Sequence, residues 1–575
     1  MAMKNITYEI PKNNREVFLY PAFNRIPELI LENRRKISGY KFEINGIPFQ
    51  ESRDKTRMDV VRQAVYYTNR IKSLIRKDPS GQRRYERNRM QKDTSVQDKL
   101  SINELTLDYE TIKNIPIIQT GHEPILYHPG IWIKNHLIQS LTKRLGGIGV
   151  NMIVDNDGCN MGFMYVPILS EKSASVGKVS LVKNKDHVAY EEIVIDDFGS
   201  LLQFKVEVID LLSKNVFREE VETIMKDMQG VFEPFINRIE AYYRQGCTDM
   251  VGLMTASRKS LEEVFGVENL EVPVSWMCDT EGFYHFMLHI LYEAGRFAKI
   301  YNEKLSEYRG IHKIRSKANP LPDLKILDNS VELPFWVWKA GGQRARCYAS
   351  NNGDDIKITD GIDTLVILKK SEDSMENISR LKTLRESGFK IRPRAITTTM
   401  FSRLFFSDVF IHGIGGAKYD TITDEIIKEF FGIDPPGFVT ISATLFLPLD
   451  AYDLDESALY DSQRIIDDMR YNPERYAPKE TQSEPALISR VEEKQRLLKM
   501  MGVGNADEKR RYFNRVKELN NLMLSQIPIE LQKKQNEMQA IRSKLAYNEV
   551  VRFREYPVCL YPMKVLCEYL LNIFS

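Results

Sequence analysis

Short apolar runs alternate with helical patterns along much of the chain, and this alternation predicts the core of the protein. An apolar run of strand length, Ile115–Ile118, is broken by Thr120 and Gly121, and a helix is expected from about Ile131 to Leu145. A second strand, 149–157, ends in acidic residues. Further strand candidates follow with helical segments between several of them: 335–338, 364–368, 395–399, 408–412 and 438–445. Such alternation favours an α/β fold, a parallel sheet with helices on its faces.

The other segments divide the chain into further units. Residues 1–105 are predicted to be mostly helical, and an inserted subdomain at 181–270 separates two parts of the core, 106–180 and 271–452. From 453 to 552 the chain has many charges and apolar residues at three- and four-residue steps, which predicts a helical hairpin or a short coiled coil. Such an arm buries little of itself, so we expect it to pack on a second copy or on the core. Residues 553–575 are apolar enough to return to the core.

Composition narrows the class of protein. At 575 residues the chain is too long for one ordinary domain, and 43% hydrophobic with 28% charged residues is typical of a soluble globular protein. Lys+Arg (81) and Asp+Glu (79) nearly balance, so no nucleic acid partner is expected. Six scattered cysteines indicate reduced thiols. The N-terminus lacks a signal-peptide pattern, and prolines and charges interrupt the apolar C-terminal stretch, so we expect a cytoplasmic protein that does not span a membrane.

Three features have a structural reading that outweighs a functional one. The basic residues between Arg70 and Lys92 fit a solvated helix pair better than a polyanion surface, because aromatic residues are nearly absent among them. His285 and His289 share a helix face, yet no acidic residue lies between them as in metalloproteases, so a packed helix is favoured. Cys159 is interpreted as a packed thiol.

Polar residues gather where the predicted strands end. His122, Glu123 and His128 lie in a turn after the first strand, and Lys134 lies in the helix that follows. In open α/β sheets ligands bind at such turns. A histidine there could act as an acid or base or stabilise charge on a transferring group. At the end of the second strand, Asp155 and Asp157 could hold Mg²⁺ or bind a substrate amine.

A second constellation spans Phe410 to Asp420. A strand is expected to end at His412, glycines 413, 415 and 416 to form a tight loop, and a helix to begin near Thr421 with a capping box to Asp424. Exposed amides at a helix start favour a phosphate or carboxylate. The glycine spacing is neither a Rossmann fingerprint nor a Walker loop, and a turn that lets helix pack on strand explains it equally well.

These two regions, together with Arg392 and Arg394, supply the candidate site. The candidate catalytic residues are His122, His128, Asp155, Asp157 and His412. The candidate substrate- or nucleotide-binding residues are Thr120, Gly121, Glu123, Lys134, Asn156, Arg392, Arg394, Gly413, Gly415, Gly416, Tyr419 and Asp420. No residue is assigned as a metal ligand.

The order of these motifs resembles the cysteine-adding enzymes of bacillithiol biosynthesis, a family of cysteine ligases. The resemblance rests on Thr120-Gly121 with Lys134 in the next helix, on Asp155-Asn156-Asp157, and on Arg392-Pro393 followed by the 413–419 glycine motif and a helical arm. Where the family has two glutamines after Thr-Gly, this chain has His122 and Glu123. His128-Pro129-Gly130 replaces a Gly-Gly-Pro turn, Asn156 stands where a histidine is usual, and the glutamate usual after the glycines is absent. The chain is therefore read as a divergent relative.

The resemblance implies a Rossmann-like core of the nucleotidyltransferase type, inserted regions, and a coiled-coil arm that mediates a homodimer. It also implies a ligase-like enzyme that joins an amino acid, with cysteine as first candidate, to an amine-bearing small metabolite. An activated acyl intermediate would require ATP with Mg²⁺. Two alternatives stay open: a nucleotidyl transferase on the same fold, and a non-catalytic dimeric scaffold that binds a metabolite.

Overall fold

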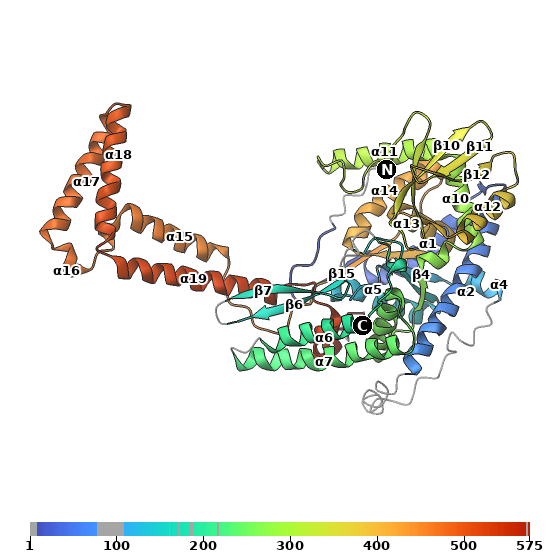
Figure 1. Ribbon diagram of the computed structural model, residues 1–575, viewed down its shortest axis with the longest axis horizontal. Helices are drawn as coiled ribbons and strands as arrows, with labels where there is room; N and C mark the ends of the chain where they lie inside the picture. Colours follow the sequence, from blue (N-terminus) through green and yellow to red (C-terminus); the bar gives the residue numbers. More distant parts are fainter. Residues whose placement is uncertain are drawn as a thin grey trace.

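A six-stranded mixed sheet lies inside the globular part of the molecule (Figure 1). The computed structural model describes residues 8–77, 108–159, 162–170, 173–182, 188–214, 218–570 and 573–574. The strands of the central sheet are β1 (Val17–Tyr20), β4 (Ile117–His122), β5 (Ile148–Ile153), β8 (Leu270–Pro273), β14 (Val409–His412) and β15 (Val439–Ala443). Across the sheet the order is β1-β15-β14-β4-β5-β8; β1 is antiparallel to β15 and all other neighbours are parallel. The predicted α/β fold with parallel strands is confirmed at this level.

Strand order places a crevice beside β4. Numbered along the chain, the five parallel strands run 3-2-1-4-5 across the sheet, with β4 first in the chain and central in the sheet. The chain winds from β4 towards β5 and β8 on one side, and later forms β14 and β15 on the other side. The winding direction therefore reverses between β4 and β14. In open α/β sheets, ligands bind at the carboxyl ends of the strands at such a switch point.

Helices cover both faces of the central sheet. The helices named here are α2 (Phe49–Arg76), α5 (Pro129–Leu145), α8 (Met250–Val264), α10 (Glu281–Tyr292) and α14 (Ile414–Phe431). Because side chains alternate along a strand, Ile118 and Ile117 of β4 point to opposite faces. Ile118 belongs to the apolar cluster that includes α5 and α8, and Ile117 to the one that includes α2, α10 and α14. Near-continuous burial of β4 fits a strand covered on both faces.

A buried carboxylate ties the two central strands to the helix layer. Asp408, just before β14, accepts a hydrogen bond from the backbone amide of Ile117 at 2.8 Å. Its oxygens also pair with Arg53 at 3.0 Å and Arg57 at 3.2 Å, both on α2. These arginines lower the pKa of Asp408 although burial opposes the charge. The pairing fixes the start of β14 against β4 and so positions the switch point.

A separate antiparallel sheet corrects part of the predicted core. Its order is β12-β11-β10-β9-β13. The bounds are β9 (Val331–Lys339), β10 (Ala345–Asn352), β11 (Asp355–Thr359), β12 (Thr364–Lys369) and β13 (Phe389–Pro393). The strands predicted at 335–338 and 364–368 therefore exist, but they lie outside the parallel sheet. The strand predicted at 395–399 is wrong, because these residues begin helix α13 (Ala395–Phe401). There the β-branched Thr397 and Thr398 donate their hydroxyls to the carbonyl of Arg394, so local bonds override strand propensity.

The remaining body elements pack around these two sheets. On the N-terminal side they are α1 (Ile26–Ser38), β2 (Glu43–Ile44), β3 (Ile47–Pro48) and α4 (Tyr109–Asn114). Between β5 and β14 they are β6 (Phe163–Leu169), β7 (Ala174–Ser180), α6 (Phe198–Ser213), α7 (Glu219–Arg244), α9 (Val274–Met277), α11 (Ala294–Ile311) and α12 (Ser374–Glu386). Of the basic run at 70–92, only residues up to Lys77 are described, at the end of α2, and 78–92 lie outside the described residues.

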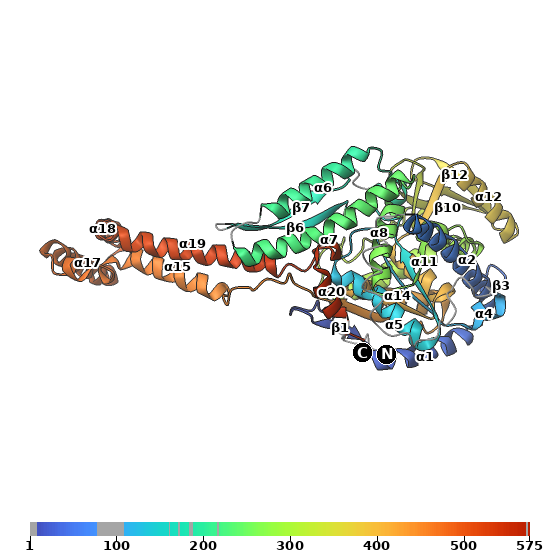
Figure 2. The same cartoon turned by 90° about the horizontal axis from the view of Figure 1, so that it is seen from below.

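Helices from 456 to 551 project from the body as an arm (Figure 1, Figure 2). The arm helices are α15 (Glu456–Tyr471), α16 (Lys479–Gln482), α17 (Pro485–Val503), α18 (Ala506–Leu524) and α19 (Pro528–Val551). In both views α15 and α19 run side by side, and α17 and α18 form a hairpin at the far end. The predicted helical character of this stretch is confirmed. The chain then returns to the body, where Tyr556 and the last helix, α20 (Met563–Leu570), join the apolar cluster on the α5 face. None of the described helices combines the length and apolar character that crossing a membrane requires.

Candidate functional site

The turn after β4 is built by the residues that begin helix α5. Pro129 occupies the first turn of the helix, and the Nδ1 atom of His128 caps the helix by accepting the Gly130 amide at 3.1 Å. At Gly130 an added Cβ would overlap Arg554 and the carbonyl of Ala443 at the end of β15. Glycine is therefore needed for the close approach of α5 to the sheet. The turn between β4 and α5 is held at the carboxyl edge, beside the switch point.

Lys134 is a buried amine beneath this turn. Its Nζ atom donates to the carbonyl of Gly121 at 2.7 Å, and the residue is only 3% exposed. Burial, with a contribution from nearby Arg258, lowers the pKa of Lys134 to about 7. Burial likewise lowers the pKa of His128 to about 3 and that of His122 well below its ordinary value, with Lys134 contributing to both. Both imidazoles are therefore neutral at pH 7, acting as dipoles and hydrogen-bonding groups without a positive charge.

Glu123 is the acidic member of the same turn. Burial raises the pKa of Glu123 to about 7, and the negative charge of Asp157 adds to the effect. The hydroxyl of Tyr190 donates to Glu123 Oε2 at 3.1 Å. Asp157 accepts a hydrogen bond from Arg344 at 2.8 Å. Glu123 can therefore exchange a proton near neutral pH, at the carboxyl end of the central strand.

The side chains of Asp155 and Asn156 form hydrogen bonds with other parts of the protein. The carboxylate of Asp155 accepts the amide of Ser275 at 2.9 Å as well as its hydroxyl, and Asp155 is 2% exposed. Burial, followed by the charge of Glu191, raises the pKa of Asp155 to about 7. The amide of Asn156 donates to the carbonyl of Pro393 at 2.7 Å. These contacts fasten the end of β5 to its neighbours and leave Asp155 poorly placed to hold Mg²⁺ or a substrate amine.

Arg392 and Arg394 also have internal partners. Arg392 donates to the carboxylate of Glu191 at 2.9 Å, and Arg394 donates to Glu332 at 2.8 Å. The guanidinium of Arg394 stacks on Trp336, 4.2 Å from the ring centre. Arg392 thereby links the antiparallel sheet to the segment that contains Glu191, which in turn donates its amide to the carbonyl of Asp155 at the end of β5, whereas Arg394 is held within the antiparallel sheet by Glu332 and Trp336 of β9.

The glycine motif after β14 forms a helix start and not a loop. Helix α14 begins at Ile414, with Gly413 as its N-cap, so the predicted start near Thr421 is wrong. The predicted capping box is absent because the Thr421 hydroxyl donates to Lys418 and Asp424 pairs with Arg403. Clustered glycines resemble a loop in the sequence, yet none of glycines 413, 415 and 416 has positive φ. The first-turn amides of an 18-residue helix thus open onto the switch point.

His122 and His412 lie on opposite faces of the sheet. The His412 ring lies 4.5 Å from that of Phe410, which belongs to the cluster containing α14, whereas His122 packs against Tyr127 of the α5-side cluster. His412 Nε2 is 2.7 Å from Asp420. Asp420 is buried and also accepts hydrogen bonds from Arg403 and Thr399, at 2.8 and 2.7 Å. His412 and Asp420 are therefore members of a buried polar network under the helix.

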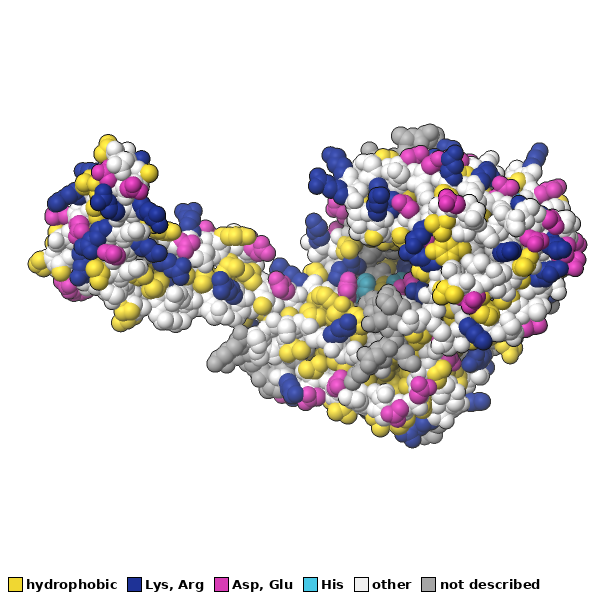
Figure 3. Space-filling model, turned by 45° about the horizontal axis from the view of Figure 1, so that its top comes forward, with side chains coloured by type: hydrophobic (Ala, Val, Ile, Leu, Met, Phe, Trp, Pro, Cys, Tyr) yellow, Lys and Arg dark blue, Asp and Glu magenta, His cyan; other side chains and the backbone are white. Residues whose placement is uncertain are grey.

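The remaining predicted residues complete the crevice. The Thr120 hydroxyl donates to the carbonyl of Ile411 at 2.7 Å and joins β4 to β14. At Gly121 an added Cβ would press on the end of the Met152 side chain on β5, so this side chain packs closely over the glycine. Tyr419 is half-buried on α14. Histidine side chains are visible inside a hollow of the surface, close to basic and acidic side chains (Figure 3).

Sequence reasoning missed Tyr190 and Arg344. They meet Glu123 and Asp157 across separations of 67 and 187 residues, and no local pattern marks either position. His285 is buried, His289 stacks on Phe431, and Cys159 is buried. Within the described residues, no group of three or more histidine, cysteine, aspartate or glutamate side chains has an arrangement that could hold a metal ion.

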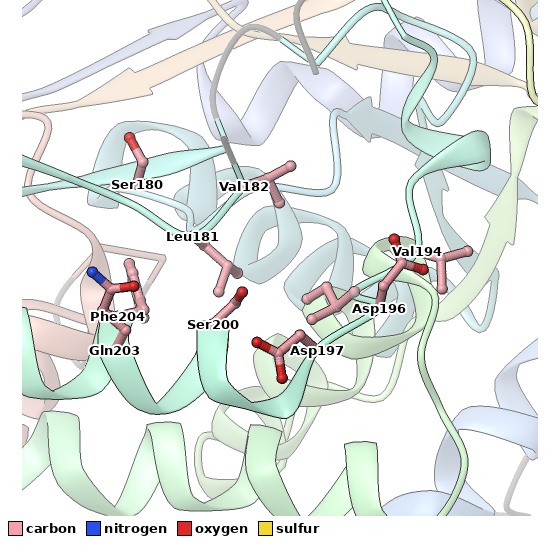
Figure 4. Close-up of a pocket in the computed structure, with 10 residues that line it drawn as sticks. Ser180, Leu181, Val182, Val194, Asp196, Asp197, Ser200, Gln203 and Phe204 are labelled. Carbon is pink, nitrogen blue, oxygen red and sulfur yellow. The ribbon is translucent and has the colours of Figure 1, made fainter. Parts of the chain in front are cut away.

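A separate cavity of about 220 Å³ lies between the end of β7 and the start of α6 (Figure 4). Ser180, Val182, Asp197 and Ser200 contribute to its lining. Asp197 also caps α6 by accepting the amide of Gly199 at 2.8 Å. None of the sequence-predicted site residues lines this cavity, so it does not belong to the crevice beside β4.

Comparison with protein-family models finds no family that matches this chain, and comparison with curated proteins finds no match. The function must therefore follow from the chemistry of the site itself.

Proposed function

We propose that the protein is a Rossmann-like group-transfer enzyme that joins an amino acid, with cysteine as first candidate, to the amine of a small metabolite. The strand order 3-2-1-4-5 is the order of Rossmann-like folds, and the polar groups lie at its switch point. Formation of an amide requires the acceptor amine to lose a proton. The proposal therefore depends on a base at the carboxyl end of β4.

The raised pKa of Glu123 is the observation on which this proposal rests. A general base works best when its pKa lies near the operating pH, and the half-buried carboxyl of Glu123 has a pKa of about 7. Lys134, 13 residues beyond Gly121 in the chain, has a similar pKa on the adjoining helix. Paired groups with strongly perturbed pKa values are enriched at catalytic sites. In this scheme Glu123 takes the proton of the acceptor amine, and Lys134 stabilises the turn through Gly121.

The helix starts fit a phosphate group better than the acidic residues fit Mg²⁺. At Gly413 and Gly415 an added Cβ would meet nothing within 4 Å, so there is open space beside the backbone at the start of α14. These amides would hold a phosphate of ATP, which would activate the amino-acid carboxyl. Asp155 is already bound to Ser275, and Asp157 to Arg344. These contacts do not fit the Mg²⁺-binding role considered for Asp155 and Asp157, and we propose no protein ligand for Mg²⁺.

The test is a product assay with the full chain. The protein is incubated with ATP, Mg²⁺, cysteine and a panel of amino sugars and amino-sugar acids, and mass spectrometry follows amide formation and released phosphate. We expect an amide product that is lost in Glu123→Gln and kept in Glu268→Gln, an exposed glutamate chosen as the matched control. Release of pyrophosphate with the nucleotide retained in the product would indicate a nucleotidyl transferase. If no product forms, and if none of these ligands stabilises the protein against thermal unfolding, the non-catalytic binding scaffold is favoured.

We further propose that the arm joins two copies of the chain. Large apolar side chains are exposed along it, including Val503 at 91%, Phe513 at 53% and Ile529 at 78%. Such side chains gain by burial against a partner. Analytical ultracentrifugation of the full chain should show a dimer, and Phe513→Asp should weaken it. A monomer at all concentrations would contradict the proposal.

A further inference from the structure

A second cavity lies on the β15 side of the carboxyl edge. Its volume is about 510 Å³, within the usual range for small-molecule sites. Four cations and one carboxylate line it together with apolar side chains such as Phe446; these charged residues are Lys12, Lys418, Arg552, Arg554 and Glu9. The lining comes from the N-terminal segment, α14, the end of β15 and the segment after the arm. Parts of the chain far apart in sequence therefore build one pocket.

The four cations have no ion-pair partner among the described residues. Glu16, the acidic side chain near Lys12, accepts the backbone amides of Lys12 and Asn13 at 3.1 and 2.9 Å. Arg554 donates to Ser442 and to the carbonyl of Ala443, and its buried Nε atom has no partner. Elsewhere in the body, arginines such as Arg392 and Arg403 have carboxylate partners. Four cations against the one carboxylate of Glu9 give the lining of the cavity a net positive charge, which attracts anions.

We propose that this cavity binds a small molecule with at least two anionic groups, phosphate or carboxylate. The lining carries a net charge of three positive units, four cations less one carboxylate. A multiply charged anion matches this excess, whereas a monoanion leaves most of it uncompensated. Phe446 supplies an apolar wall for the carbon part of the ligand. Arg554 also lies against Gly130 at the start of α5, so the cavity adjoins the turn that carries Glu123, but anion binding there does not depend on amide formation.

Binding is tested by isothermal titration calorimetry of the full chain with pyrophosphate, citrate and acetate. We expect pyrophosphate or citrate to bind, with an affinity that falls as salt is added, and acetate to bind far more weakly. Comparison of pyrophosphate with citrate decides between phosphate and carboxylate ligands. The test variant replaces the three exposed cations with alanine: Lys12, Lys418 and Arg552. Because they lack ion-pair partners in the described protein, the fold should be retained, and the dissociation constant should rise at least about tenfold.

A matched variant controls for net charge. It removes two lysines and one arginine from exposed positions on the arm, far from the cavity: Lys499→Ala, Lys509→Ala and Arg511→Ala. This variant should bind as the unmodified protein does. Glu9→Gln should tighten binding, because it removes the one carboxylate that lines the cavity. Failure of both pyrophosphate and citrate to bind, or equal losses of affinity in the pocket and arm variants, would overturn the proposal. Neither outcome bears on the Glu123 assay.

Discussion

The buried amine of Lys134 makes the stability of the protein depend on pH in a calculable way. Burial holds its pKa at about 7 in the folded protein, against an ordinary value of 10.5. Between these values the unfolded chain binds the proton more tightly than the folded protein. The charged amine therefore destabilises the fold below about pH 7, and this penalty disappears as the pH rises towards 10.5. Replacement by the isosteric, uncharged side chain in Lys134→Met removes the penalty.

The magnitude follows from the difference between the two pKa values. It corresponds to about 5 kcal/mol below neutral pH, of which about 3 kcal/mol is recovered between about pH 7 and pH 10. Lys134→Met also loses the bond to the Gly121 carbonyl, which costs about 1–3 kcal/mol at every pH. The pH-dependent part of the difference in unfolding free energy can therefore be separated from the constant part. The unmodified protein should gain about 3 kcal/mol relative to the variant over this pH range.

Urea denaturation of both proteins, followed by tryptophan fluorescence from pH 7 to 10, measures this gain. Comparison of the two proteins cancels the titration of tyrosines and cysteines that they share. Lys143→Met, at an exposed position of the same helix, is the matched control and should show no such change with pH. A difference between Lys134→Met and the unmodified protein that stays constant with pH would refute the reasoning. It would mean that the amine is as well solvated in the fold as in water.

Three further predictions concern other buried groups. Asp408→Asn leaves two buried arginines without a counter-charge and should destabilise the protein by about 3–5 kcal/mol in urea titrations; a loss under about 1 kcal/mol would contradict this. The amide-forming activity should rise with pH through about 7, and the kcat/KM profile of Glu123→Gln should lack this rise if any activity survives. Gly282→Ala forces a Cβ of α10 onto Thr56 of α2 and should lower the urea midpoint, with a loss of about 1–3 kcal/mol. Adding Thr56→Ala should recover part of that loss.

Elements with one dominant local signal could be predicted from the sequence, and those decided by distant contacts could not. The apolar run that contains Ile117 and Ile118 is buried on both faces, and the pattern through Trp132 gives helix α5. The threonines at 397 and 398 have strand propensity, but hydroxyl bonds to Arg394 support a helix. Strand order was beyond reach, because it depends on pairings such as Val409 with Ile118, 291 residues apart in the chain.

The same distinction between local signals and distant contacts applies to the residues of the candidate site. Glu123 and Lys134 could be identified because both follow the recognisable strand β4 closely in the sequence, Glu123 directly after it and Lys134 in the next helix. His412 was grouped with them because it ends a strand at the same edge, yet the two-residue alternation sends it to the other face. Asp155 looked available because its neighbours in the sequence do not reveal Ser275, 120 residues away. Spacing thus finds the edge of the sheet, whereas side-chain direction and distant partners decide which groups remain free.

The two ends of the arm lie side by side where it joins the body, and we call this junction the neck. The side chain of Asn548 accepts the amide of Tyr452 at 2.7 Å and donates to its carbonyl at 2.8 Å, and Leu447 donates to Val551. Entry and exit are therefore neighbours in space although nearly 100 residues of chain separate them. Because its ends adjoin, the outer part of the arm can be replaced by a short loop, whereas the part of α19 that packs against β6 and β7 belongs with the body. The neck marks where the arm can be exchanged, shortened or fused to a reporter while the sheet and its crevice keep their shape.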